Sequence, residues 1–387
     1  MPLVRAPRIP TLLSLSFVSV CLLLLAVSAR ADYDIVAGVN GGYIGNLYLD
    51  SNDVEDSYST TQASFKYYPL SQIEIDLTGA YTYYSKKFDL SNFLYSGKIT
   101  FIPTSEESPF SVYLSGAYDN VQYREKREDI DNNNSRWIAS IGYRLSPVVN
   151  LRAGSRLTAT RYPNSEDIDA DHEKYELFAG INLSLFGSNS VDIEAGLGRI
   201  DFVFLDPDTE IVKPPGFGLP AEILEGNLRL YYISPRFSRP LGSRTGLSIS
   251  YTYRQFTNPD EVLIFGFATE FLSPWASIYE GSSVTVKLKS YMIPRMVVTT
   301  GAGYWDKTYL TALEEWINPA YGGKEWRRSK RQDYFTRLYI SLQRPVSFGM
   351  SGMLKPTVTV DYSHNNSSDE GYDYSGTTVS VAIVYRR

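Results

Sequence analysis

Cysteine is nearly absent from this chain of 387 residues, since Cys21 is the only one. Cys21 lies inside an N-terminal apolar run, so the chain beyond that run has neither a disulfide framework nor a thiolate metal site. Histidine is almost as rare, with His172 and His364 alone, both in segments expected to be external loops. Neither histidine stands beside a recognisable nucleophile motif. The sequence therefore predicts that the protein is not an enzyme and that it needs no cofactor.

Long apolar runs are also missing, apart from the one at residues 12–27. No later stretch approaches the roughly 20 apolar residues that a transmembrane helix needs. Arg5 and Arg8 precede the N-terminal run, and Ala29-Arg30-Ala31 follows it as a small-x-small cleavage site. These features predict a cleaved signal peptide at residues 1–31 and a single domain at residues 32–387.

Positive charge is in deficit, because 37 Lys and Arg face 43 Asp and Glu, for a net charge of −6. An acidic chain argues against nucleic acid as a partner. Two acidic segments place carboxylates at alternate positions, as calcium loops do, but lack the glycine and the glutamate that such loops use. A solvated acidic loop is therefore the favoured interpretation, and the weak metal candidates are Asp129, Asp131, Asp167, Asp169 and Asp171.

What the chain has in abundance is period-2 alternation of apolar and polar residues, as in residues 76–83 and 247–254. Such segments form strands with one apolar and one polar face. We expect about sixteen of them, near residues 33–49, 58–68, 72–84, 90–102, 110–123, 136–145, 149–161, 174–186, 190–204, 227–236, 246–256, 283–291, 295–305, 334–344, 354–363 and 376–386.

The connections between these segments alternate between short turns, such as residues 146–148 and 187–189, and long polar loops, such as residues 124–135 and 205–226. The 31 tyrosines gather towards the strand ends, where an interfacial girdle would place them. The pattern predicts an all-β fold: a closed antiparallel transmembrane β-barrel of about 16 strands, with roughly 14 to 18 possible. Both termini would lie at the short-turn end, in the periplasm.

In this pattern, residues 32–387 resemble the bacterial outer-membrane β-barrel proteins, and the general porin type most closely. The resemblance lies in the pattern of strands and loops and not in a sequence motif. Such proteins usually end on an aromatic residue, whereas here Tyr385 is followed by Arg386 and Arg387. The resemblance implies a location in the outer membrane, in contact with lipid and lipopolysaccharide.

If the apolar residue of each pair faces lipid, the other residue lines the lumen. Basic positions outnumber acidic ones in this inward set, which favours anions. Cross-strand pairing of the same charges, which would only hydrate the interior, is the alternative. The main pore-lining candidates are Glu74, Asp76, Arg152, Arg156, Glu176, Arg229, Arg254, Lys287, Lys289 and Arg337, and the wider set adds Lys66, Lys98, Lys174, Asp192, Glu194, Lys355 and Asp361.

Two predicted long loops have unusual content. Residues 262–272 are strongly apolar, and exposing such a segment to water is costly. They are a candidate constriction loop through Leu263, Phe265, Phe267 and Phe271, although packing over the barrel mouth or extending a strand would also cover them. Residues 310–317 are predicted to form a short helix in the next loop.

The most economical function is a porin-like outer-membrane channel for passive diffusion of small polar or charged solutes, with a mild preference for anions. One alternative is a barrel that serves as a sleeve or exit duct of a larger envelope complex, for polysaccharide export or redox transfer. Another is a closed barrel whose outer loops bind ligands or cells. Whether the protein forms a homo-oligomer stays open.

Overall fold

The computed structural model describes residues 32–47, 54–104, 107–124, 130–163, 171–202, 227–257, 278–291, 293–318, 323–348 and 352–386. Only the backbone is described for residues 310–318 and 323–329. The predicted signal peptide at residues 1–31 lies outside this part of the chain.

Strands make up nearly all of the described chain. The first half contains β1 (Asp32–Ile44), β2 (Asp56–Leu70), β3 (Ile73–Tyr84), β4 (Asn92–Phe101), β5 (Phe110–Tyr123), β6 (Asn132–Ser146), β7 (Val149–Arg161), β8 (His172–Leu185) and β9 (Asn189–Phe202). The second half contains β10 (Asn227–Pro240), β11 (Thr245–Phe256), β12 (Glu280–Ser290), β13 (Val297–Asn318), β14 (Gly323–Gln343), β15 (Val346–Phe348), β16 (Gly352–Ser367) and β17 (Tyr374–Arg386). Three short 3-10 turns are η1 (Phe88–Leu90), η3 (Phe186–Ser188) and η6 (Glu370–Tyr372).

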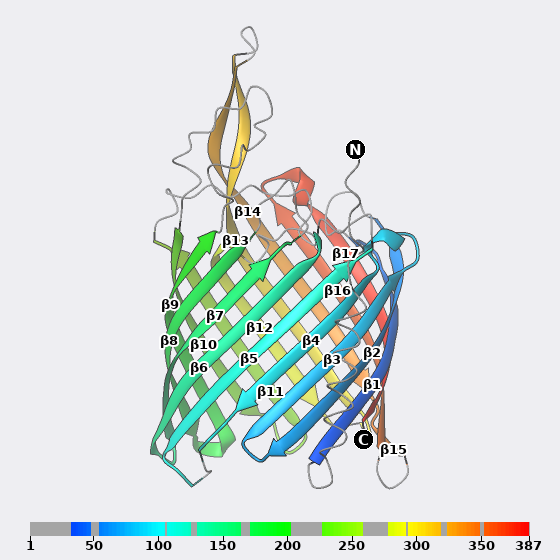
Figure 1. The fold of residues 1–387 in the computed structure, drawn as a ribbon, viewed down its shortest axis with the longest axis vertical. Helices are drawn as coiled ribbons and strands as arrows, with labels where there is room; N and C mark the ends of the chain where they lie inside the picture. Colours follow the sequence, from blue (N-terminus) through cyan, green and yellow to red (C-terminus); the bar gives the residue numbers. More distant parts are fainter. Residues whose placement is uncertain are drawn as a thin grey trace, which may run out of the picture.

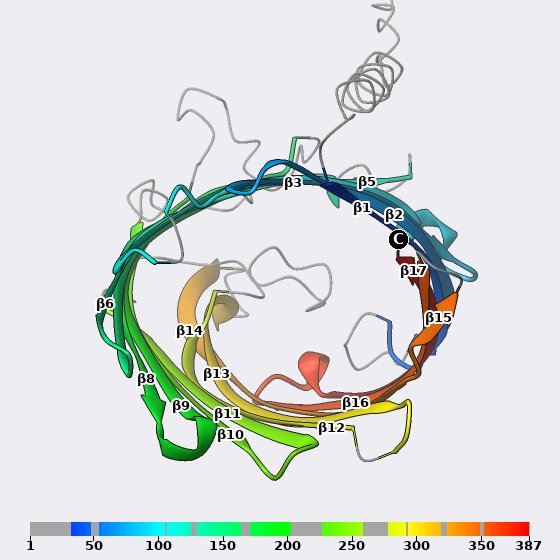
Figure 2. The same cartoon turned by 90° about the horizontal axis from the view of Figure 1, so that it is seen from below.

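The strands close into one antiparallel barrel, seen from below in Figure 2. Each strand pairs with its sequence neighbours, and β1 closes the ring by pairing with β17 from Val36↔Arg386 to Ile44↔Thr378. The sheet has 17 strands, but β15 continues β14 beyond a break, and both pair with β16. Sixteen places therefore surround the lumen in the described chain, which confirms the predicted closed barrel of about 16 strands. Closure satisfies the backbone hydrogen bonds that an open edge would leave unpaired.

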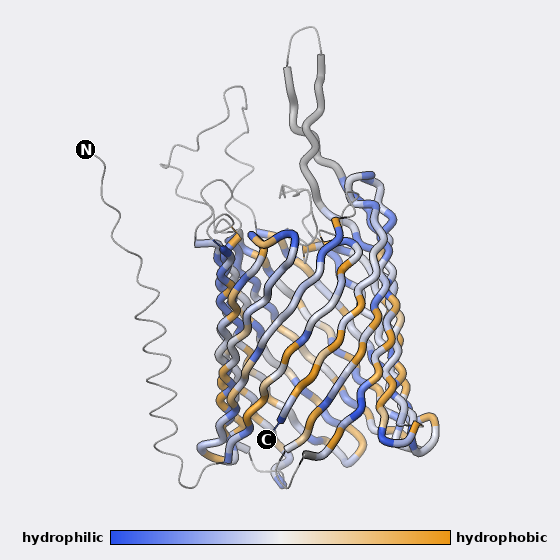
Figure 3. The backbone as a smooth tube through the Cα atoms, turned by 90° about the vertical axis from the view of Figure 1, so that its right-hand side faces the viewer, coloured by the Kyte–Doolittle hydropathy of each residue, from blue (hydrophilic) through white to orange (hydrophobic). Residues whose placement is uncertain are grey.

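Residues of alternating character form these strands because the two faces meet different surroundings. Outward positions are apolar and exposed, as Ile141 (61 %) and Trp137 (56 %) show for β6. Apolar and polar positions alternate along the strands all over the wall of the barrel in Figure 3. An exposed apolar outer wall around a polar interior is the arrangement of a barrel that spans a membrane. In the described part of the chain, no helix is long and apolar enough to cross a membrane.

The connections have different lengths at the two ends of the barrel (Figure 1). Residues 71–72, 147–148 and 241–244 are turns at one end, called here the short-turn end. The longer connections, such as the one between β9 and β10, lie at the opposite, long-loop end. β1 begins and β17 ends at the short-turn end, where the guanidinium of Arg386 lies 2.6 Å from the carboxylate of Asp34 across the closing seam.

The helix predicted at residues 310–317 is wrong, because β13 continues as a strand to Asn318. Its ladder with β14 runs past Tyr309↔Arg331 to Asn318↔Gly323, and this hairpin rises above the other strands in Figure 1. A helix of so few residues is marginal by itself. Continuing the hairpin gains a ladder hydrogen bond at every second residue without a nucleation cost, so the strand prevails.

Candidate functional site

The inner wall of the barrel, made by the residues that alternate with the apolar outward set, carries most of the charge on the strands. Direct cross-strand partners share a face, so the registers carry the inward assignment from strand to strand, for example Asp34↔Lys66, Lys66↔Asp76 and Asp76↔Lys98. The predicted pore-lining residues on this wall are Glu74, Asp76, Arg152, Arg156, Glu176, Arg254, Lys287, Lys289 and Arg337.

Arg229 is different, because the structure places it on the outer wall. It is exposed and shares the parity of the outward residues Tyr231 and Ile233 on β10. Its neighbours Leu228 and Leu230 are the ones that point inward, at 0 % and 6 % exposure. The assumption that apolar residues face lipid fails here, because an apolar cluster occupies the inner wall at this height.

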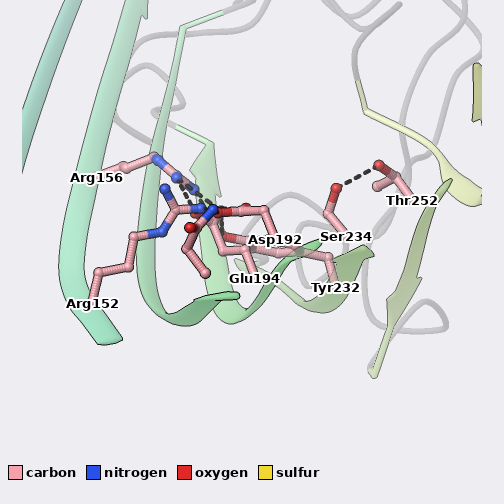
Figure 4. Close-up of polar contacts among 8 residues, drawn as sticks. Arg152, Arg156, Asp192, Glu194, Tyr232, Ser234 and Thr252 are labelled. Atoms are coloured by element: carbon pink, nitrogen blue, oxygen red, sulfur yellow. Dashed lines mark hydrogen bonds and ion pairs between the residues drawn. The ribbon is translucent and has the colours of Figure 1, made fainter. Parts of the chain in front are cut away.

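The densest group of inner-wall charges, called here the Glu194 cluster, consists of Arg152, Arg156, Asp192, Glu194 and Tyr232 (Figure 4). The Glu194 carboxylate accepts hydrogen bonds from Arg156 Nη2 at 2.8 and 2.9 Å and from the Tyr232 hydroxyl at 3.0 Å. Arg152 Nη2 lies 3.0 Å from Glu194 and 2.9 Å from Asp192. Glu194 is 8 % exposed, so one buried carboxylate holds two guanidinium groups against the wall.

Two glycines make room for the aromatic rings that hold Arg156. Gly154 pairs with Phe178, and a Cβ on Gly154 would lie 2.7 Å from the Phe178 ring. Gly196 pairs with Tyr232, and a Cβ there would lie 2.5 Å from that ring. The Arg156 guanidinium then lies 4.1 Å over the Phe178 ring, a cation–π contact that adds to its ion pair.

Other inner-wall charges form ion pairs within one strand or between neighbouring strands around the barrel. Lys66 lies 3.2 Å from Glu74 and 3.0 Å from Asp76, and Lys174 lies 3.0 Å from Glu176. Further pairs on this wall include Arg136–Asp119 and Arg337–Asp361. These ion pairs neutralise many of the charges on the inner wall. Pairing of this kind is the alternative to an excess of positive charge that the sequence analysis considers.

Three of the lysines that these pairs leave over lie on opposite sides of the lumen. Within the described chain, no carboxylate forms an ion pair with Lys98 of β4 or with Lys287 and Lys289 of β12. Lys289 instead lies 5.3 Å over the Tyr291 ring. Because β4 and β12 are half a ring apart, these ammonium groups face the lumen from both walls. Each is near the short-turn end of its strand.

Hydroxyl groups line the wall between the Glu194 cluster and β12. Ser234 Oγ and Thr252 Oγ1 lie 2.9 Å apart, and Ser250 Oγ and Thr285 Oγ1 lie 3.1 Å apart. With Arg152 and Arg236 they border a cavity of about 310 Å³. This surface offers hydrogen-bond donors and acceptors to a solute, and the surface itself has no strong net charge.

Several predicted residues fall elsewhere. The constriction candidates Leu263, Phe265, Phe267 and Phe271 lie outside the described residues, as do Asp129, Asp167 and Asp169. The described Asp131 and Asp171 accept hydrogen bonds at 2.6 Å from the backbone nitrogens of Tyr123 and Tyr162, so each closes the base of a long loop. The described residues contain no group of three His, Cys, Asp or Glu side chains that could hold a metal ion.

The two histidines lie on strands, so the prediction that they lie in external loops is wrong. His172 is the first residue of β8 and is buried, and His364 is an exposed residue of β16. Sequence reasoning also missed Tyr232, because tyrosines were assigned to the lipid face. Its register opposite the inward Arg254 is the signal that could have found it.

A closed barrel with an apolar outer wall and a charged inner wall belongs to the class of outer-membrane β-barrels. No protein-family model matches the chain, and no curated protein matches it. Among solved structures, Pseudomonas aeruginosa OccK2 (OpdF), in complex with glucuronate, is similar at 11 % identity and a TM-score of 0.49, over 92 % of this chain and 98 % of that chain.

Acinetobacter baumannii OccAB3 is similar at 11 % identity and a TM-score of 0.48, over 92 % of this chain and 100 % of that chain. Pseudomonas aeruginosa OccK1 (OpdK) is similar at 10 % identity and a TM-score of 0.47, over 92 % and 98 %. These similarities concern the course of the chain alone.

Proposed function

We propose that the protein is a porin-like channel of the outer membrane, through which small polar or charged solutes diffuse passively with a mild preference for anions. The observation that carries this proposal is the contrast between the two walls of one closed barrel. Exposed apolar residues cover the outside, whereas ion pairs, hydroxyls and lysines cover the inside. A polar inner wall is stable only where water reaches it.

A barrel with this number of strands is wide enough to leave an aqueous lumen between its walls. Selection would then depend on the width that the loops leave and on the charge of the wall. No chemical step is required of any residue.

The sign of the preference follows from the charges that remain after pairing. Each carboxylate of the Glu194 cluster is shared with an arginine, whereas Lys98 and Lys287 have no carboxylate within ion-pair distance in the described chain. Basic groups on opposite walls raise the local concentration of anions. Because most other charges are paired, the preference is expected to be mild.

Conductance of the refolded protein in a planar bilayer tests the proposal, with a salt gradient to read ion selectivity. Stable open steps and a reversal potential on the anion side are expected. Cation-selective steps would keep the channel but refute the charge argument. Absence of conductance from protein shown to be folded by its heat-modifiable gel mobility would refute the channel itself.

A further inference from the structure

The basic residues in the turns of the short-turn end lie on one side of the barrel. No Lys or Arg occurs in the connections of the first half at this end, at residues 71–72, 102–109, 147–148 and 186–188. The second half contributes four arginines, called here the arginine arc: Arg239, Arg244, Arg295 and Arg344. The segments that carry them contain no Asp or Glu, over residues 237–247, 288–298 and 342–354. In Figure 1 the short-turn end is the lower end of the barrel.

The arginine arc follows three consecutive connections at the edge of the outer wall. Arg239 lies on β10 opposite the outward Leu247 of β11, and Arg244 lies in the turn between these strands. Arg295 lies in the turn between β12 and β13, and Arg344 directly follows β14. All four arginines are exposed. Because neighbouring strands are about 4.8 Å apart, the arc extends along about 20 Å of the rim.

The guanidinium groups of the arginine arc are not compensated by the protein. Within the described chain, none of the four has a carboxylate within ion-pair distance or a hydrogen-bond acceptor. By contrast, Arg386 at the same end lies 2.6 Å from the carboxylate of Asp34. The arc therefore presents charge and N–H donors at the edge of the wall, and a guanidinium can bind two phosphate oxygens at once.

The backbone at Arg295 gives a separate reason to expect a role for this side chain. Its φ is 60°, in the left-handed region. Glycine or asparagine adopts this region at a lower conformational cost than arginine does. The turn accepts this local strain and carries a cation there, and strain of this kind points to a binding role.

Exposed apolar side chains alternate with the arginines along the same connections. Each connection of the arc carries at least one of them: Leu241, Tyr291, Ile293 and Val346. The Tyr291 backbone nitrogen donates to the Arg244 carbonyl oxygen at 2.8 Å, so two of the connections are in contact. Side chains of this size are costly in water and stable among acyl chains, with tyrosine at the boundary to the headgroups. The arc thus combines cations with a surface that suits lipid.

We propose that the arginine arc binds the phosphate groups of anionic phospholipids, of the phosphatidylglycerol class, in the leaflet around the short-turn end. A zwitterionic phospholipid carries its own ammonium group beside the phosphate, so it gains less from the arginines. An acidic soluble protein would satisfy the charge but would leave the apolar side chains in water. The site lies on the outside of the barrel and does not depend on the channel function.

Lipid retention tests this proposal. The refolded protein is reconstituted into vesicles of phosphatidylglycerol and phosphatidylcholine in equal amounts with identical acyl chains, and is then extracted in mild detergent. Native mass spectrometry counts the lipids that stay bound. Phosphatidylglycerol should be retained over phosphatidylcholine by at least about tenfold, and high salt should reduce this preference. Equal retention of the two lipids would overturn the proposal and leave the arc to an acidic soluble partner.

Two triple variants at the arc separate its charge from its shape. Arg244→Gln, Arg295→Gln and Arg344→Gln together should remove the preference for phosphatidylglycerol, because three of the four cations are lost while the apolar side chains stay. Arg244→Lys, Arg295→Lys and Arg344→Lys together should keep most of it, because the charge is kept. A preference that survives the glutamine variant would overturn the site.

The matched control removes the same charge at the long-loop end, through Lys86→Gln, Lys87→Gln and Lys330→Gln together. This variant should leave the preference for phosphatidylglycerol unchanged. An equal loss in the control and in the glutamine variant of the arc would show that only the total charge matters, which would overturn the site. Heat-modifiable gel mobility confirms that each variant is folded.

A fluorescent reporter tests the position of the bound lipid. Leu241→Trp places an indole within the arc, and Ile102→Trp places one at the same end between β4 and β5, half a ring away. In the mixed vesicles either phosphatidylglycerol or phosphatidylcholine is brominated, and quenching is measured as the difference from the parent protein. Brominated phosphatidylglycerol should quench Leu241→Trp more strongly than brominated phosphatidylcholine, and the two should quench Ile102→Trp equally. Equal quenching of Leu241→Trp by both lipids would refute the position of the site.

Discussion

At the scale of single residues, Glu194 is the inner-wall carboxylate that joins three other side chains. Its oxygens lie 2.8 Å from Arg156, 3.0 Å from Arg152 and 3.0 Å from the Tyr232 hydroxyl. Because Glu194 is nearly buried, its charge acts on these partners with little screening by water. The residue holds two arginines in place and cancels part of their charge.

Glu194→Gln should therefore shift the reversal potential further towards anions, because the two guanidinium groups keep their charge and lose the shared carboxylate. It should also lower the free energy of unfolding by about 2–4 kcal/mol, through the loss of charged hydrogen bonds. Asp201→Asn is the control, since Asp201 pairs with Arg199 on the outer wall, 2.5 Å away. The control should leave selectivity unchanged, and a shift of equal size in both variants would contradict the role of Glu194.

The glycines under the aromatic rings give a second prediction at this scale. Gly196→Ala should destabilise the barrel by about 1–3 kcal/mol, because the added Cβ would lie 2.5 Å from the Tyr232 ring and 2.7 Å from the Leu177 carbonyl oxygen. Gly79→Ala on β3 is the matched control, since nothing lies within 4 Å of its Cβ. Urea unfolding followed by heat-modifiable mobility measures both, and equal midpoints would argue against the ring packing.

At the scale of elements, one carboxylate ties a long-loop connection to a strand. Asp56, the first residue of β2, accepts hydrogen bonds from the backbone nitrogens of Ser85, Lys86 and Lys87 at 3.1, 2.9 and 2.7 Å. It also accepts one from the Ser85 hydroxyl at 2.7 Å. The connection from β3 through η1 to β4 is thereby held beside β2, and the Asp56 side chain is buried.

Asp56→Ala should release this connection and speed tryptic cleavage after Lys86 and Lys87, because their backbone nitrogens lose their acceptor. Glu55→Ala is the control, since Glu55 is exposed and its pair with Lys86 spans 3.9 Å. Mass spectrometry of timed digests identifies the cut sites. Equal cleavage of Asp56→Ala and Glu55→Ala would mean that the connection is held by other contacts.

The elements themselves could be predicted closely from the sequence, because lipid outside and water inside impose alternation on every strand. The segments predicted at 110–123 and 149–161 coincide with β5 and β7. Alternation says nothing about how far a strand continues beyond the membrane, so the long β13–β14 hairpin was missed. It also misled at Arg229, where inward leucines reverse the usual assignment.

The candidate site was less predictable for a related reason. Alternation can place a residue on the inner wall, but it does not say which charges meet. The contacts of Glu194 join β7, β9 and β10, and the distance between Arg156 and Glu194 depends on the glycines and rings between them. Three-dimensional register, and not pattern, decides which charges remain unpaired.

At the scale of the whole molecule, the chain is acidic, with a net charge of −6, while the lysines that pairing leaves over face the lumen. The selectivity of a channel depends on charges within about one Debye length of the ion path, roughly 10 Å at 0.1 M salt. Carboxylates on the outer wall or on loops beyond the rim contribute little to ion selectivity. Net charge alone would therefore predict the opposite sign to the anion preference that we propose.

Reversing the charge of two facing lysines tests this argument. Lys98→Glu combined with Lys287→Glu should turn the channel from mildly anion-selective to cation-selective, because both walls then present carboxylates at the short-turn half of the lumen. The same exchange at the long-loop rim, Lys86→Glu, is the control, since the Lys86 side chain is 64 % exposed and Lys86 lies beyond the end of β3. The reversal potential in a salt gradient, read at low and high ionic strength, measures the change. Screening should shrink the effect at high salt, and a double variant that stays anion-selective at low salt would show that other groups set the sign.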